Sequence, residues 1–176
     1  MRVRTIFALA GTAALLAIPV ATASPSDNAV VESASGGINW TIPLPNVFGV
    51  EVVSQPLAFN AVKYVDGRVS GRFEYIQKAG GDTFKFGVDV TCMNVYGGNR
   101  AKIGGIVTES SDPTIAVGMY GWFQVFDNGE GANAAADQSS LIGFGDEAAN
   151  EAFCNSPNLP RFGPWDVQGN VQVRTS

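Results

Sequence analysis

Alternation of apolar and polar residues with a period of two is the feature of this 176-residue chain that most restricts its fold. It runs through residues 68–75, 84–92, 101–107 and 167–174. Successive side chains of a strand point to opposite faces of the sheet, so this alternation is typical of half-buried antiparallel strands. We therefore predict an all-β fold, in which the alternation places Cys92 on the core-facing side.

Glycine-containing turns separate these segments and indicate that sequential strands are neighbours. The pair Asp66-Gly67 is typical of a type I′ hairpin, and glycines at 80–81 and 97–98 supply positive φ at low cost. Glycines inside the strands fit the bends by which a small sheet coils and closes. We predict an antiparallel meander that closes into a small calycin-like β-barrel, with a β-sandwich as the alternative.

Two further elements are expected in the second half of the chain. The run from Thr114 to Phe126 is apolar on both alternating sets, which predicts a long strand covered on both sides. A short helix is predicted near residues 146–154, with Asp146 as its N-cap and Glu147 in the first turn, where the helix dipole favours an anion.

The N-terminus has the features of a secretory signal peptide. Arg2 and Arg4 precede an almost wholly apolar run at residues 6–20, and residues 21–23 are the small residues that signal peptidase accepts. The apolar run is shorter than the roughly 20 residues needed to span a bilayer. Export is therefore predicted, to the outside of the cell or its envelope, without membrane insertion after cleavage.

These boundaries predict one folded domain. Residues 1–23 are the expected signal peptide, residues 24–37 a flexible leader rich in Ser, Ala and Gly and poor in large apolar residues, and residues 38–176 a single β domain.

The cysteines and the absence of histidine restrict the chemistry. Cys92 and Cys154 in an exported chain predict one disulfide, although two free thiols are the alternative. With no His, Ser-His-Asp and Cys-His catalysis and imidazole zinc sites are excluded. A non-enzymatic role is therefore favoured, and any enzyme would rely on carboxylates, Lys, Tyr or an oxygen-bound metal.

Charge is negative overall and unevenly distributed. The net charge of −5 becomes about −7 when the two signal-peptide arginines are removed, which argues against nucleic acid or an anionic membrane as partners. Residues 103–160 contain no Lys or Arg, whereas the segment 63–102 is rich in both. The acidic segment is either a solvated face paired internally with basic residues or a site for a cation.

A loop of small residues, FDNGEGANAAADQ at 126–138, concentrates three carboxylates. Asp127, Glu130 and Asp137 are candidate metal ligands, because closely spaced oxygen donors on a tight turn suit Ca²⁺. Their spacing is not that of an EF-hand, and Asp-Asn-Gly is equally typical of an ordinary turn.

The same loop allows a second interpretation, a hydrolase acting on carbohydrate. Glycoside hydrolysis requires two carboxyl groups about 5–9.5 Å apart, which Asp127 and Glu130 would supply. Stacking faces for a sugar would come from Tyr120, Trp122 and Trp165.

Three segments together resemble a known sequence pattern: LAFNAVKYVDGRVSGRFEYIQ from Leu57, FKFGVDVTCMNVYGGNRAKIGGIVTES from Phe84, and FQVFDNGEGANAAADQSS from Phe123. The pattern is similar to that of a widespread family of hypothetical secreted bacterial β-proteins. Its motifs are F-N-A before an Asp-Gly hairpin, D-V-T-C, I-G-G-x-V-T and D-N-G-E-G-A-N. The resemblance implies export, a β fold and an acidic loop that belongs to the shared architecture, but no activity.

The function that we expect is a secreted, non-enzymatic β-barrel binding module for a small apolar ligand. Small barrels enclose either packed side chains or one small ligand. The residues expected to line the interior are Phe73, Tyr75, Phe86, Met119 and Trp122. The alternatives are a calcium-stabilised structural or adhesion module and the carboxylate-based hydrolase.

Overall fold

The structure is a computed structural model that describes residues 27–40, 52–79, 81–131, 133–158 and 163–176. The expected signal peptide lies outside these ranges. No helix within them is long and apolar enough to cross a membrane.

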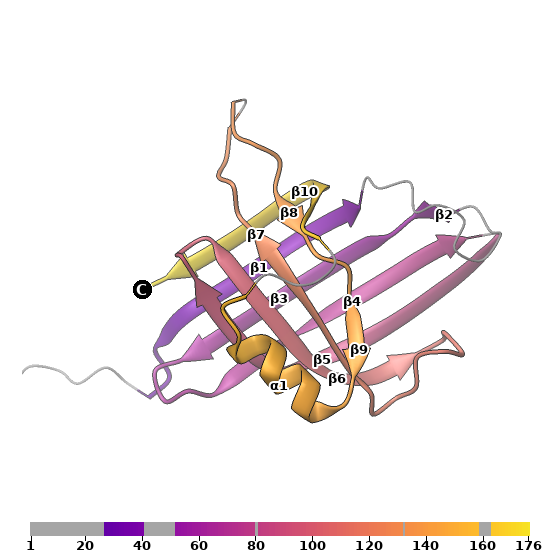
Figure 1. The fold of residues 1–176 in the computed structure, drawn as a ribbon, viewed down its shortest axis with the longest axis horizontal. Coiled ribbons are helices and arrows are strands. Elements are labelled where there is room, and N and C mark those ends of the chain that lie inside the picture. The colour runs from indigo at the N-terminus through magenta and orange to yellow at the C-terminus, as the bar shows by residue number, and fades with distance from the viewer. Residues whose placement is uncertain (1–26, 41–51, 80, 132, 159–162) are drawn as a thin grey trace, which may run out of the picture.

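The described residues form one antiparallel sheet and one helix (Figure 1). The elements are β1 (Val30–Trp40), β2 (Val52–Ser54), β3 (Pro56–Tyr64), β4 (Val69–Ala79), β5 (Asp82–Tyr96), β6 (Arg100–Ser110), β7 (Tyr120–Phe126), β8 (Gln138–Ser139), β9 (Gly143–Gly145), α1 (Glu147–Asn155) and β10 (Trp165–Thr175).

Eight of these strands close into a ring. Their order is β4-β3-β1-β10-β8-β7-β6-β5, and β5 pairs back with β4. The Asp66-Gly67 turn joins β3 to β4, with Gly67 at a φ of 87°. The predicted all-β fold, with a closed antiparallel arrangement and one short helix, is therefore confirmed.

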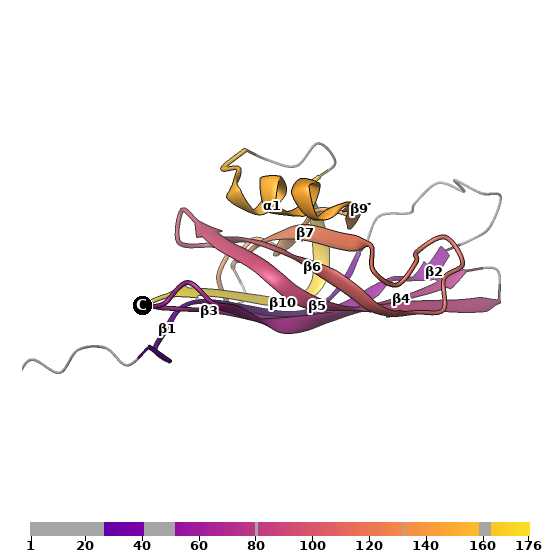
Figure 2. The same ribbon diagram turned by 90° about the horizontal axis from the view of Figure 1, so that it is seen from below.

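The ring is flattened, so that β6 and β7 lie over β1 and β3 (Figure 2). Phe123 on β7 crosses the interior and meets Phe59 of β3 and Phe73 of β4 edge to face, with ring centroids 5.3 and 5.0 Å apart. Aliphatic side chains fill the space around these rings and are almost wholly buried: Val88, Ile103, Val107, Val125 and Val171. Burial of this apolar surface supplies the main stabilisation of the ring.

The predicted flexible leader is wrong from residue 30 onward, because β1 begins at Val30 and pairs along its length with both β3 and β10. The composition of β1 is misleading for a steric reason. A Cβ at Gly36 would lie 2.6 Å from the carbonyl oxygen of Asn170 and 2.7 Å from the ring of Phe59. Small residues are needed here for packing, so their low hydrophobicity does not indicate disorder.

The orientation predicted for Cys92 is also wrong, although its disulfide is confirmed. The register between β5 and β6 shifts between Val90 and Cys92. Val90 and Met93 both lie in the core, so the bulge turns Cys92 outward. There it bonds Cys154 of α1 across a sequence separation of 62 residues. Figure 2 shows α1 on this outer side, over β6 and β7.

The predicted helix is confirmed, whereas the long strand from Thr114 is not. The side chain of Asp146 accepts a hydrogen bond from the backbone N–H of Ala149 at 2.8 Å, as an N-cap does. The strand β7 begins only at Tyr120. Before it the chain turns, with Gly118 at a φ of 93° and the side chain of Val117 exposed.

Candidate functional site

Two carboxylates of the acidic loop bind backbone N–H groups of β10. Asp137, which is 6% exposed, accepts from the N–H of Val171 at 2.7 Å through one oxygen and from that of Asn128 at 2.9 Å through the other. Asp127 accepts from the N–H of Val173 at 2.9 Å. These oxygens therefore act where the carbonyls of a neighbouring strand would.

These hydrogen bonds are important because few backbone pairs close the ring between β7 and β10. The strand joining them, β8, contributes only the pairs Val125–Ser139 and Phe126–Gln138 on one side and two on the other. We call β8 together with the carboxylates of Asp127 and Asp137 the seam. Through these two carboxylates the acidic loop stays hydrogen-bonded to β10 beyond the residues that β8 pairs.

Glu130 has a weaker part in the same loop. It is exposed and accepts from the side-chain amide of Gln172 at 3.0 Å. The second oxygen of Asp127 accepts from the N–H of Gly129 at 2.9 Å, so the Asp-Asn-Gly segment is also an Asx turn.

The structure adds no support to a metal or catalytic role for these carboxylates. Across the described parts of the chain, no three Asp, Glu or Cys side chains are grouped to hold a metal ion. Both oxygens of Asp127 accept backbone N–H groups, and Glu130 lies against the Gln172 amide. The calcium site and the hydrolase pair of Asp127 and Glu130 stay predictions.

The residues expected to line the interior do not all lie together. Phe73 and Phe86 belong to the buried core, and Tyr75 and Met119 are half-buried against it. Trp122 instead stacks on Phe153 of α1, with ring centroids 6.0 Å apart, on the outer side of the sheet.

The misplacement of Trp122 has a physical reason. The strand β7 is buried on both faces, by the core on one side and by α1 on the other. Both faces are therefore rich in apolar residues, and the sequence does not show which face points to the core. In the structure the core-facing residues are Phe123 and Val125.

Four aromatic side chains form a continuous cluster at one end of the ring interior, which we call the aromatic end: Trp40, Tyr75, Phe86 and Phe144. Tyr75 lies between Trp40 and Phe86, with ring centroids 5.8 and 5.1 Å away. Phe144 of β9 meets Phe86 at 5.2 Å. The cluster joins β1, β4, β5 and β9. Tyr75 and Phe86 lie in the alternating segments of the sequence, whereas Trp40 and Phe144 lie outside them.

The aromatic end contains two polar atoms that lack partners. Trp40 is 5% exposed, and its indole nitrogen Nε1 is buried without a hydrogen bond. Among the described residues, the hydroxyl of Tyr75 has no hydrogen-bond partner either. Burial raises the pKa of Tyr75 above its ordinary value, with a smaller contribution from Asp112. A buried Trp usually finds a partner for its N–H, so the Trp40 indole leaves the aromatic end chemically incomplete, whereas the half-buried Tyr75 is partly accessible to water.

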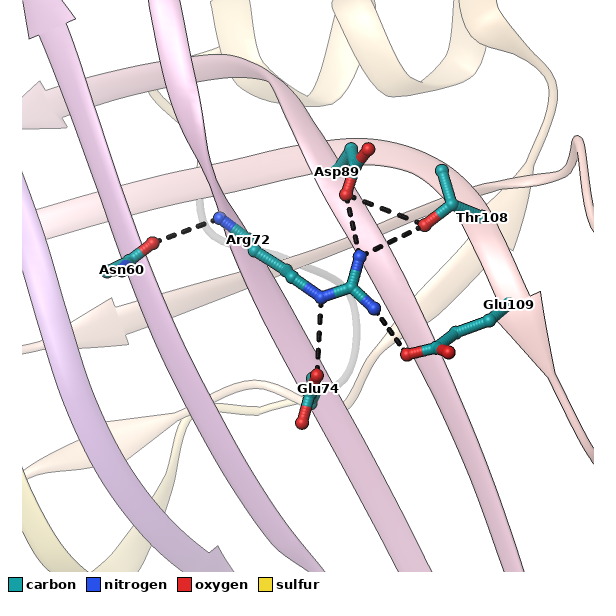
Figure 3. Close-up of polar contacts among 6 residues, drawn as sticks. All are labelled: Asn60, Arg72, Glu74, Asp89, Thr108 and Glu109. Atoms are coloured by element: carbon teal, nitrogen blue, oxygen red, sulfur yellow. Dashed lines mark hydrogen bonds and ion pairs between the residues drawn. The ribbon is translucent and has the colours of Figure 1, made fainter.

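A separate charged cluster on the outer face centres on Arg72 (Figure 3). The guanidinium donates to Glu74 at 3.2 Å, to Asp89 at 2.8 Å and to Thr108 at 3.2 Å, and it also donates to Glu109. The hydrogen bond to Glu74 is the main cause of a raised Arg72 pKa. The cluster clamps β4, β5 and β6 together, and all three nitrogens of its guanidinium donate to protein groups.

Comparison with known proteins yields no match among protein-family models, curated proteins or solved structures. The resemblance to a family of secreted bacterial proteins therefore stays a prediction, and the functional argument depends on the geometry of this chain.

Proposed function

We propose that the protein is a secreted, non-enzymatic binding protein whose aromatic end takes a small, largely apolar ligand bearing a hydrogen-bond acceptor. One observation carries this proposal. The buried indole nitrogen of Trp40 has no partner, and it lies in an aromatic cluster whose Tyr75 hydroxyl is also unpartnered among the described residues.

The chemistry of these two groups defines the ligand. An indole N–H only donates, so it requires an acceptor such as a carbonyl oxygen, whereas a phenol either donates or accepts. The rings of Tyr75 and Phe86 offer apolar faces for the rest of the molecule. An aromatic or alicyclic ketone, ester or amide meets both requirements.

Packing limits the size and position of the ligand. Deeper in the ring, Phe73 and Phe123 are fully buried and in contact with each other, so that region is filled by the protein. Tyr75 is half-buried, which leaves part of its side chain accessible. The ligand therefore covers the aromatic end and does not thread through the ring.

Two features support the secreted, non-enzymatic part of the proposal. The Cys92–Cys154 disulfide is of the kind that persists in oxidising compartments outside the cytosol. The chain contains no His, the commonest general base near neutral pH.

The test is an NMR titration that follows the indole N–H signals of the purified, oxidised protein, with Trp40→Phe used to assign the signal of Trp40. The probes are acetophenone, cyclohexanone and methyl benzoate, and ethylbenzene serves as an apolar probe without an acceptor. We expect a saturable downfield shift of the Trp40 signal with at least one carbonyl probe and none with ethylbenzene.

Two matched variants separate a specific site from general apolar contact. Tyr75→Phe removes the unpartnered hydroxyl and should weaken binding severalfold. Tyr64→Phe removes a hydroxyl on the exposed part of the sheet, 3.5 Å from Ser70, and should leave binding unchanged. The proposal is wrong if no carbonyl probe gives a saturable Trp40 shift, or if both variants behave alike.

A further inference from the structure

Helix α1 lies over the outer face of β6 and β7 (Figure 2). This face carries a second group of polar side chains. Lys102 of β6 and Gln124 of β7 are direct partners in the strand ladder, so their side chains share this face. Arg100 precedes Lys102 by two residues and belongs to the same face. Lys102 is 1% exposed and Gln124 is 0% exposed.

The two cations on this face have no counterion within the described parts of the chain, where the ion pairs involve other bases. The ammonium of Lys102 donates to the carbonyl oxygens of Phe153 at 3.2 Å and Asn158 at 2.6 Å. Arg100 donates through one Nη to the carbonyl of Pro157 at 2.9 Å. These acceptors are neutral, so among the described residues the two neighbouring positive charges are surrounded by carbonyls and aromatic rings but have no carboxylate partner, in a chain that is acidic overall.

Some N–H donors on this face have no hydrogen-bond acceptor among the described residues. The Nε of Arg100 is buried without a partner. An ammonium has three protons, and Lys102 uses two of them on carbonyls. Burial lowers the pKa of Lys102, and the positive charge of Arg100 lowers it further.

Gln124 completes the set. Both its Nε2 and its Oε1 are buried and lack hydrogen-bond partners. Its backbone is fixed, because its N–H donates to the hydroxyl of Ser140 at 2.9 Å and its carbonyl accepts from the Ser140 N–H at 2.8 Å. A fully buried amide with neither atom satisfied is rare in native proteins and needs an explanation.

We propose that Arg100, Lys102 and Gln124 form a binding site for a small oxyanion, such as a carboxylate, sulfate or phosphate. The oxyanion would accept hydrogen bonds from the Arg100 Nε, the remaining Lys102 proton and the Gln124 Nε2. Ordered water would satisfy the Gln124 amide but would not supply a negative charge. An anion would accept hydrogen bonds from the amide and also offset the charges of Arg100 and Lys102. The rings of Tyr96 and Phe153 lie 5.2 Å from Arg100 and 4.5 Å from Lys102 and limit access of bulk water.

This site is independent of the aromatic end, because it lies on the outer face of the sheet and the aromatic end lies inside the ring. The helix above it is fixed in place. The Cys92–Cys154 disulfide holds α1, and the carbonyl of Cys154 also accepts from the Tyr96 hydroxyl at 2.5 Å and the Asn94 amide at 3.1 Å.

The test compares thermal unfolding of the oxidised protein in phosphate, sulfate, acetate and chloride at constant ionic strength. The main variant is Gln124→Leu, which replaces an unsatisfied amide with an apolar group of similar size and should keep the fold. Lys102→Met removes one charge of the site. The matched control, Lys85→Met, removes one charge from an exposed position of β5.

We expect a saturable rise in the midpoint with at least one oxyanion relative to chloride. The apparent dissociation constant should rise at least tenfold in Gln124→Leu and Lys102→Met and stay unchanged in Lys85→Met. Comparison of phosphate, sulfate and acetate then distinguishes an inorganic anion from a carboxylate.

Phosphate and sulfate also stabilise proteins non-specifically through exclusion from the surface. A rise of equal size in Gln124→Leu, Lys85→Met and the parent protein would therefore overturn the proposal, as would the absence of any rise relative to chloride.

Discussion

Replacement of Asp137 by Ala should open the seam and destabilise the whole ring. The change removes both acceptors of a 6% exposed carboxylate, which serve the N–H groups of Val171 and Asn128. Val171 is fully buried, so its N–H gains no water in exchange, and an unsatisfied buried donor costs about 1–3 kcal/mol. Asn128 is half-buried and adds a smaller loss. The free energy of unfolding should fall by about 2–4 kcal/mol, which lowers the midpoint by roughly 4–16 °C for a domain of this size.

The assay is urea and thermal unfolding followed by circular dichroism, with two further variants for calibration. Asp137→Asn keeps one acceptor oxygen and should lose about half as much stability as Asp137→Ala. Glu130→Ala removes an exposed carboxylate of the same loop and should cost less than about 0.5 kcal/mol. The reasoning fails if Asp137→Ala unfolds like the parent protein, or if Glu130→Ala is equally destabilising.

Two further predictions follow from packing and burial. Gly36→Ala should lower the free energy of unfolding by about 1–3 kcal/mol, because its Cβ would lie 2.6 Å from the Asn170 carbonyl oxygen. Gly37→Ala should be near neutral, because its Cβ would have no atom within 4 Å. Equal urea midpoints for the two variants would contradict this prediction. Burial raises the Tyr75 pKa above its ordinary 10.0, so the unfolded chain loses this proton first and stability should fall as pH rises above about 10. Tyr75→Phe should show a smaller alkaline loss in melts from pH 9 to 11, and an identical pH profile would refute the assignment.

The parts of the fold that were predictable are those determined by local pattern. The segment Phe84–Val90 alternates cleanly, and Asp66-Gly67 and Asp146 are local signals for a turn and a helix N-cap, because the preferred backbone geometry depends on the residue itself.

The remaining features depend on contacts between distant residues. The small residues of β1 are required by the ring of Phe59 and by β10, neither of which composition reveals. The bulge before Cys92 inverts the alternation, and no residue of β5 marks it, although the facing residues on β6 are Gly104 and Gly105.

The candidate sites were predictable only in part for the same reason. The aromatic character of Tyr75 and Phe86 is visible in the sequence, but the missing partner of the Trp40 indole depends on the assembled ring. The carboxylates of the acidic loop were conspicuous as possible metal ligands, yet their contacts with β10 require the loop to meet a strand more than thirty residues away.

Pairing of β1 with β10 has a consequence for how the chain acquires its structure. These strands lie at opposite ends of the described chain but match residue for residue from Glu32–Thr175 to Trp40–Val167. During synthesis the ring therefore stays open until β10 has left the ribosome. Such non-local pairing makes folding slow, because the chain loses loop-closure entropy before the contacts between its distant strands stabilise it.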